Sequence, residues 1–286
     1  MPIYSPALPP SPHFSKDKSP IPALVRFDLG RIWRNKIGRF FGLVFIGILA
    51  VQLTVIYTKY LLDASVLEQA KGIAGHILPK PAALQASLLH GAMLFFLWFQ
   101  SAWINGALVS RDTLYRVRPL IYAHPVRPAE YLAAKAIIAI GMPFCFQLPF
   151  IFLPWLLSLL LAGAGGPIWA TAPLHLVPAA ALNSMVIASV TLGASSLAGT
   201  PKTGMAWALG LIFGLGAVGG ILFAILHDPN WMAINPAALT ESWPKLLCGA
   251  DNASVPLTPS IIATAVNICL WAYVSWQRTR PSEAVI

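Results

Sequence analysis

Charged side chains are scarce in this sequence. Asp, Glu, Lys and Arg make up only 10% of its 286 residues, whereas 57% of the residues are hydrophobic. Soluble domains carry about 25% charged residues, because a charged surface keeps them dispersed. The three cysteines, Cys145, Cys248 and Cys269, have neither a metal-ligand spacing nor the pattern of a disulfide framework. The composition therefore predicts a membrane protein and argues against a soluble enzyme or a disulfide scaffold.

Sequence motifs for catalysis are also missing. The chain has no G-x-x-x-x-G-K-[ST], G-x-S-x-G, H-E-x-x-H or C-x-x-C motif. Residues 199–204 come nearest to a phosphate-binding loop, but their order and spacing are wrong. We therefore predict that the chain is not an enzyme, has no catalytic, cofactor-binding or metal-binding residues, and cannot hydrolyse ATP alone. If it drives transport, the energy must come from a partner.

Six long apolar segments are present, and none contains Asp, Glu, Lys or Arg. A helix rises about 1.5 Å per residue, so roughly 20 residues cross a hydrocarbon core about 30 Å thick. We expect Pro143, Pro149 and Pro154 to kink the third segment. The predicted fold is an all-α, polytopic membrane protein whose transmembrane domain covers residues 40–277, with spans at about 40–58, 88–110, 136–161, 176–198, 204–226 and 260–276.

The segments that flank the spans have their own character. Residues 1–22 contain seven prolines and predict a disordered tail, and residues 278–286 form a second tail. Residues 23–39 mix apolar and basic side chains, which predicts an amphipathic helix at the membrane interface. We also expect a surface helix near 66–77 and one or two re-entrant or surface helices within 227–259, before the last span.

The distribution of basic residues predicts the topology. Placing both termini, the 111–135 loop and the Lys202 turn inside puts 15 of the 19 Lys and Arg residues there, while the acids divide five and five. This is the bias that the positive-inside rule requires. The net charge of +9 therefore reflects orientation in the membrane and not binding to nucleic acid. We expect a multi-pass protein of the inner (cytoplasmic) membrane, with both termini cytoplasmic.

The 111–135 loop is the longest polar interruption between apolar segments in the middle of the chain. It carries five basic residues and two acids, and Pro119, Pro125 and Pro128 prevent one continuous helix. Residues 111–118 could form two helical turns across the membrane surface. Pro128 suits the first position of a new helix, with Glu130 in its positively polarised first turn. An ordinary loop whose charge only sets orientation is the alternative.

This loop resembles the segment between the second and third spans of ABC-2 type transporter permeases. The matching elements are residues 109–112, 119–123, 125–127 and 130–132, closed by Lys135. The Arg118-Pro119 pair stands where many members have a glycine or a small residue. The resemblance implies a permease subunit, by analogy with the family an exporter, whose coupling helix docks onto a separate ATPase subunit. A pair of permease chains would work with two such ATPase subunits, which bind ATP and Mg²⁺. The implied contacts are Arg111, Asp112, Tyr115, Arg118, Tyr122, Arg127 and Glu130.

The fifth span is rich in glycine, which lets helix backbones approach closely in lipid. Gly210 and Gly214 share one face of the predicted helix, and Gly216 and Gly220 share another. With Gln52 in the first span, these residues predict contact with a second permease chain, identical or homologous. Close packing within a single chain explains them equally well. The family resemblance also implies a dimer built on the first and fifth spans.

Two other functions remain open from the sequence. An ion-coupled secondary transporter would place ionisable residues inside the membrane, and the six predicted spans have none. A polytopic membrane enzyme that acts on lipid would need a cluster of polar or metal-binding residues at one membrane face, and the 111–135 loop offers basic groups without a nucleophile or an acid–base pair. Co-purification of an ATPase would separate the permease from both.

Overall fold

The chain folds into a bundle of helices. The structure is a computed structural model and describes residues 19–65, 86–117, 121, 126–162, 171–250 and 253–280, with only the backbone of 59–65. These residues form helices and turns without β-strands. Most of the predicted N-terminal tail, the expected surface helix near 66–77, and the end of the C-terminal tail lie outside the described residues.

Within the described residues, six helices are long and apolar enough to cross a membrane, as predicted. Most run several residues beyond the predicted spans, because a helix continues until a cap, turn or proline ends it, whereas hydropathy marks only its charge-free part. The second is interrupted by a turn at 106–109. Their bounds are α2 Lys36–Ser65, α6 Ala92–Asn105 followed by α7 Ser110–Leu114, α9 Pro128–Ala162, α11 Ala172–Leu197, α12 Pro201–Leu226 and α14 Leu257–Thr279.

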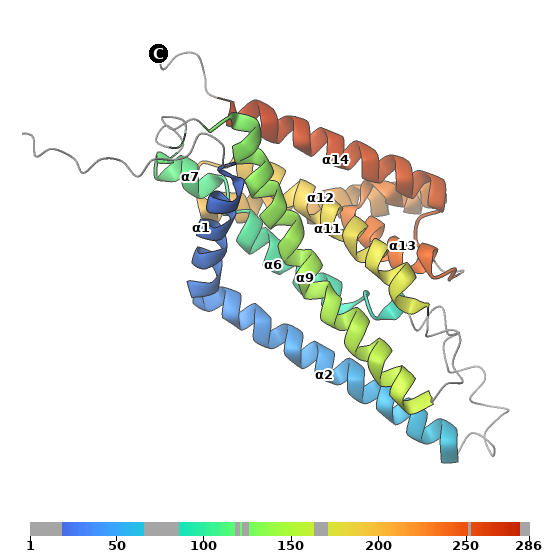
Figure 1. Ribbon diagram of the computed structural model, residues 1–286. Helices are drawn as coiled ribbons and strands as arrows, with labels where there is room; N and C mark the ends of the chain where they lie inside the picture. The colour runs from blue at the N-terminus through green and yellow to red at the C-terminus, as the bar shows by residue number, and fades with distance from the viewer. Residues whose placement is uncertain are drawn as a thin grey trace, which may run out of the picture.

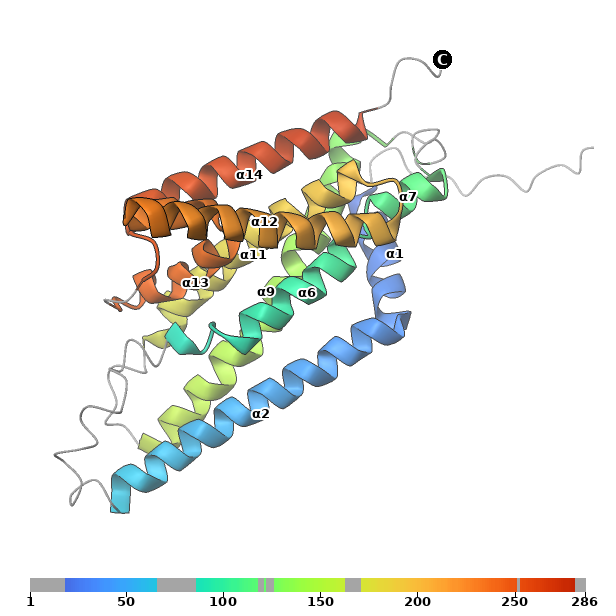
Figure 2. The same ribbon diagram turned by 180° about the vertical axis from the view of Figure 1, so that it is seen from behind.

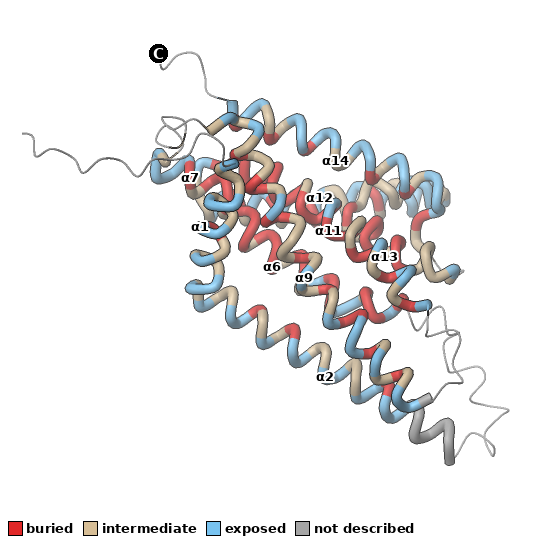
Figure 3. The backbone as a smooth tube through the Cα atoms, in the orientation of Figure 1, coloured by how far each residue is buried: buried red, intermediate tan, exposed pale blue. Residues whose placement is uncertain are grey.

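Helix α11 lies at the centre of the bundle (Figure 1) and packs against α6, α9, α12, α13 and α14. Sixteen of its 26 residues are buried. In the most apolar windows of α2 and α12 only 11% of residues are buried, against 67% in α11. Figure 3 shows the same contrast, with buried residues concentrated around α6 and α11. The exposed apolar faces of the outer helices suit contact with lipid.

Buried polar side chains join the inner helices. Asn105 donates to Thr191 Oγ1 and to a backbone carbonyl of α9, both at 3.1 Å. Gln147 on α9 donates to Ser184 Oγ at 2.9 Å. Ser189 on α11 donates to Asn267 Oδ1 on α14 at 3.0 Å. These side chains act as interhelical contacts, which is how amides in membrane helices are usually satisfied.

A helix covers most of the segment that we predicted to be amphipathic, but it ends before residue 39. Helix α1 spans Ile21–Arg34, and the extended backbone of Asn35 separates it from α2. Lys36 and Arg39, which we expected on the interfacial helix, therefore belong to α2. Helix α1 packs against the first half of α9 and meets α2 at a sharp angle (Figure 1).

The two ends of the bundle differ in charge. The turn after α6, the start of α9 and the end of α14 lie together at one end (Figures 1 and 2), which we call the basic end after Arg111, Arg116, Arg127, Lys202 and Arg278. The other end, the opposite end, carries the 3-10 helix η2 (Pro229–Ile234) and helix α13 (Pro236–Leu247). Two short helices thus precede the last long helix, and α13 packs against α11 and α14.

Candidate functional site

The segment 106–117, which we call the elbow, turns the chain at the end of α6. Helix α7 has only five residues, and Arg116 adopts a left-handed conformation with φ of 50°. The expected two helical turns across 111–118 are interrupted: one turn spans Ser110–Leu114, a turn follows at 115–116, and Val117 is helical again, while Arg118 lies outside the described residues. A left-handed residue interrupts an α-helix, because the following residues can no longer donate to the carbonyls four positions back.

Two contacts anchor the elbow to the bundle. The hydroxyl of Ser195 on α11 accepts hydrogen bonds from the backbone N–H groups of Val109 and Ser110, at 3.0 and 3.1 Å. It thereby satisfies donors at the start of α7 that have no partner within the helix. Gly106 and Gly204 bring the backbones of the elbow and α12 together, since a Cβ on Gly204 would lie 2.1 Å from the Gly106 carbonyl oxygen.

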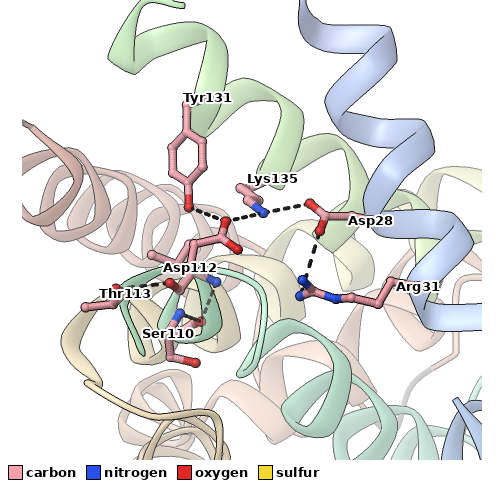
Figure 4. Close-up of polar contacts among 9 residues, drawn as sticks. Asp28, Arg31, Ser110, Asp112, Thr113, Tyr131 and Lys135 are labelled. Atoms are coloured by element: carbon pink, nitrogen blue, oxygen red, sulfur yellow. Dashed lines mark hydrogen bonds and ion pairs between the residues drawn. The ribbon is translucent and has the colours of Figure 1, made fainter. Parts of the chain in front are cut away.

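A buried ion-pair network lies directly behind the elbow (Figure 4). Lys135 Nζ on α9 is 2.6 Å from Asp28 Oδ2 on α1 and 2.6 Å from Asp112 Oδ2 on α7. Tyr131, one turn before Lys135, donates its hydroxyl to the same oxygen of Asp112 at 2.9 Å. Arg31 on α1 lies 3.8 Å from Asp28 Oδ1. Three segments that are distant in the sequence thus meet at one lysine.

The network is both buried and balanced in charge. The side chains of Lys135, Asp28 and Asp112 are 4%, 2% and 5% exposed. Two carboxylates face two cations once Arg31 is included. Leaving one buried charge without its partner costs about 3–5 kcal/mol. The network therefore favours the single arrangement in which α1, α7 and α9 are held together.

The predicted coupling residues divide into exposed and buried groups. Tyr115 is 67% exposed, and Arg127 is exposed at the start of α9. Glu130 accepts a hydrogen bond from the Arg127 backbone N–H at 2.8 Å and so caps α9. Arg111 is half-buried and lines a small recess together with Arg31. Arg118 and Tyr122 lie outside the described residues.

Asp112 requires a correction. We expected it to contact a partner, but its carboxylate is buried against Lys135 and Tyr131. The sequence gave no sign of this. A five-residue helix turns some side chains toward the bundle and others away from it, and a position in a charged loop does not tell which way Asp112 points. Asp112 therefore holds the elbow in place and is not a surface contact.

The residues predicted for a dimer interface also separate. A Cβ on Gly210, Gly214 or Gly220 would meet nothing within 4 Å, so these glycines face outward. Gly216 instead packs against Asn235, which precedes α13, at 3.5 Å from the added Cβ. Gln52 donates to the backbone carbonyl of Leu88 at 3.3 Å, also within the chain. Gly210, Gly214 and Gly220 are therefore open on the surface of α12, whereas Gly216 packs within its own chain.

Sequence reasoning missed Asp28 and Tyr131 as members of the network. Asp28 is the one acid within α1, among the apolar residues of an otherwise basic helix. Tyr131 and Lys135 are four residues apart and therefore share one face of α9. An acid on the inward face of an amphipathic helix was the available signal, but its partner is 107 residues away.

A second polar cluster occupies the opposite end. Glu241 on α13 has one carboxylate oxygen, Oε1, that lies 2.6 Å from Lys245 Nζ, 2.9 Å from His90 Nε2 and 3.1 Å from Ser254 Oγ. His90 lowers the pKa of this carboxyl most strongly, burial opposes that effect, and Lys245 adds to the lowering, which brings the pKa to about 2. Glu241 is therefore ionised at neutral pH.

No metal-binding group of three or more His, Cys, Asp or Glu residues occurs in the part of the chain that the structure describes. Comparison with known proteins adds no relative: no protein-family model matches the chain, and no curated protein matches it.

Proposed function

We propose that this chain is the transmembrane permease subunit of an ABC transporter of the ABC-2 type, an exporter in which the elbow receives the movement of a separate ATPase. The resemblance of the 111–135 loop supports this proposal. The observation that carries it is the buried network behind the elbow. A rigid link is needed wherever a partner outside the membrane must move helices inside it.

The ion-pair network links the elbow to α1 and α9. A force on Tyr115 would pass through α7 to Asp112, and from there through Lys135 to α9 and through Asp28 to α1. Because separating these charges is costly, the three segments move together. Closure of an ATPase pair would then rotate α1 and α9 as one body, a rigid-body transition of a kind known in other proteins.

The basic end faces the cytoplasm in this proposal, since the positive-inside rule places Lys and Arg there. Both termini are then cytoplasmic, in the inner membrane. Two ATPase subunits would bind ATP and Mg²⁺, and two permease chains would pair. Figure 2 shows α6 between α2 and α12 on one side of the bundle, and α12 presents its open glycines outward. This side provides the pairing surface and the transport path between the chains.

Affinity purification of the full chain from its own membranes tests the coupling. We expect an ATPase to co-purify and its activity to respond to the permease. Tyr115→Ala should weaken recovery or uncouple ATP hydrolysis while insertion and folding stay intact, because this side chain is 67% exposed. Tyr273→Ala is the matched control, since Tyr273 is 62% exposed on α14. Equal ATPase recovery and coupling in both variants would contradict the role of the elbow.

Cysteine cross-linking tests the pairing. Gly214→Cys should form disulfides between chains, because nothing covers this position. Gly216→Cys, two residues away, should not, because it faces Asn235 of its own chain. Cross-links of equal yield at both positions, or at neither, would rule out this face of α12 as the contact.

A second candidate, a proton-coupled transporter, is favoured by one observation. Lys135 and Asp112 are ionisable, buried and part of helices long enough to span a membrane, and such residues mark proton pathways in transporters. However, they are paired with one another near the basic end and do not face an open path. Transport driven by a proton gradient in vesicles without any ATPase would favour this candidate over the permease.

A further inference from the structure

A cavity of about 380 Å³ lies at the opposite end, between α6, α12 and α13. This volume is within the range of small-molecule sites, about 300–1,000 Å³. Most of its wall is apolar, with Leu94, Phe95, Phe99, Leu209, Ile212 and Phe213 among the lining residues. Phe95 and Phe213 are 53% and 57% exposed. Since α6 and α12 are both apolar spans, these exposed rings lie at membrane depth, and the cavity opens on the α6–α12 side of the bundle, beside the proposed pairing surface.

The polar groups of the cavity are few and gathered toward α13. Thr240 has both of its hydrogen bonds satisfied within the chain, since it accepts from Trp98 and donates to the Ala237 carbonyl. Asn235 also lines the cavity: its side-chain oxygen caps α13, and its Nδ2 amide hydrogens have no partner in the described residues. These hydrogens suit an acceptor such as a phosphate or ester oxygen.

Glu241 supplies a hydrogen-bond acceptor that complements the amide donor of Asn235. All of its contacts in the described part of the chain fall on Oε1, so Oε2 has no partner there. An ionised carboxylate oxygen accepts most strongly from a charged N–H donor. Lys245 beside it balances the carboxylate charge. The cluster therefore suits a ligand that carries an ammonium and a phosphate together more than an anionic ligand.

The geometry points to a resident lipid site: one phospholipid with a primary ammonium head group, its acyl chain in the cavity and its ammonium at Glu241 Oε2. Asn235 Nδ2 donates to the phosphate or an ester carbonyl. The site lies within one chain, at the end away from the elbow, so it goes beyond the proposed function and does not depend on an ATPase.

Native mass spectrometry of the delipidated full chain tests this assignment. The probes are phosphatidylethanolamine, phosphatidylcholine and phosphatidylglycerol with identical acyl chains. Phosphatidylcholine has the same charges as phosphatidylethanolamine but no N–H donor, and phosphatidylglycerol has a net negative charge. We expect one tightly bound phosphatidylethanolamine, with the other two about tenfold weaker, the loss expected when a single charge-assisted hydrogen bond is missing.

Two variants, each with a control, test the acyl-chain cavity and the head-group contact separately. Ala217→Trp adds an indole at the wall of the cavity and should abolish the tight site, whereas Ala224→Trp, on the same helix but not lining the cavity, should leave it unchanged. Glu241→Gln should reduce phosphatidylethanolamine binding to the level of phosphatidylcholine, and Asp228→Asn, which lies before η2 and does not line the cavity, should not.

Equal retention of phosphatidylethanolamine by Ala217→Trp and the wild type would overturn the cavity as the site. Equal binding of phosphatidylethanolamine and phosphatidylglycerol would overturn the head-group assignment. Should the tryptophan variant fail to fold, Glu241→Gln still decides the outcome, because its shape is conserved. Recovery of an ATPase by each variant, measured in parallel, keeps failure of this site separate from failure of the proposed function.

Discussion

Replacing Lys135 with methionine removes the cation that holds α1, α7 and α9 together. Lys135→Met keeps the length of the side chain but leaves Asp28 and Asp112 buried, at 2% and 5% exposure, without their shared partner at 2.6 Å. Breaking a buried ion pair costs about 3–5 kcal/mol, a large share of a typical stability of about 5–15 kcal/mol. At about 2–4 °C per kcal/mol for a chain of this size, the unfolding temperature should fall by about 6–20 °C.

Thermal unfolding of the purified chain in detergent, followed by size-exclusion fluorescence, measures this effect. Lys202→Met is the matched control, because Lys202 is exposed at the same end and surface changes usually stay within about 0.5 kcal/mol. Adding Asp112→Asn to Lys135→Met restores the charge balance, since Asp28 keeps Arg31, and should recover much of the loss. If Lys135→Met unfolds like Lys202→Met, or if the second substitution recovers nothing, the network does not hold the elbow.

Three further predictions follow from other parts of the bundle. Gly204→Leu should destabilise the protein strongly in the same unfolding assay, because its Cβ would lie 2.1 Å from a backbone oxygen of the elbow, whereas Gly210→Leu, with nothing within 4 Å, should be tolerated. Glu241 has a lowered pKa, so its ionised form stabilises the fold above pH 4.5, and this contribution should be lost as the pH falls toward about 2. The stability of Glu241→Gln should not show this loss. If the stability of the variant and of the wild type fell equally between pH 4.5 and pH 2, the contacts of that carboxylate would be contradicted. In a cysteine-free background, Ala250→Cys should label from outside the cell and Val117→Cys only after permeabilisation, and labelling of residue 117 from outside would reverse the orientation.

Local sequence was a good guide to the individual helices. Pro128 begins α9, as its lack of an N–H group and its fixed φ led us to expect. Thr200 and Thr203 form a capping box ahead of α12, and Pro201 occupies its first turn. The break at Asn35 was missed, because the amphipathic pattern of 23–39 continues across it and hydropathy does not record a change of backbone direction.

The candidate site was predictable only in part. The charged 111–135 loop could be located from its prolines and basic residues, because these are local properties. Which of its side chains face the bundle could not, since Asp112 and Tyr115 are three residues apart on a five-residue helix and its C-cap. One is buried and the other is 67% exposed, because of helices that contact α7 from elsewhere in the chain.

The sequence by itself determined that six segments are long and apolar enough to cross a membrane as helices, because hydrophobic length is a property of each segment alone. The tertiary structure decided which residues meet. It brought Asp28 to Lys135 across 107 residues, and it turned Gly216 toward its own chain while Gly214 remained open. Periodicity gives the face of a helix on which a residue lies, but only the packing of the other helices decides whether that face meets a neighbour or lipid.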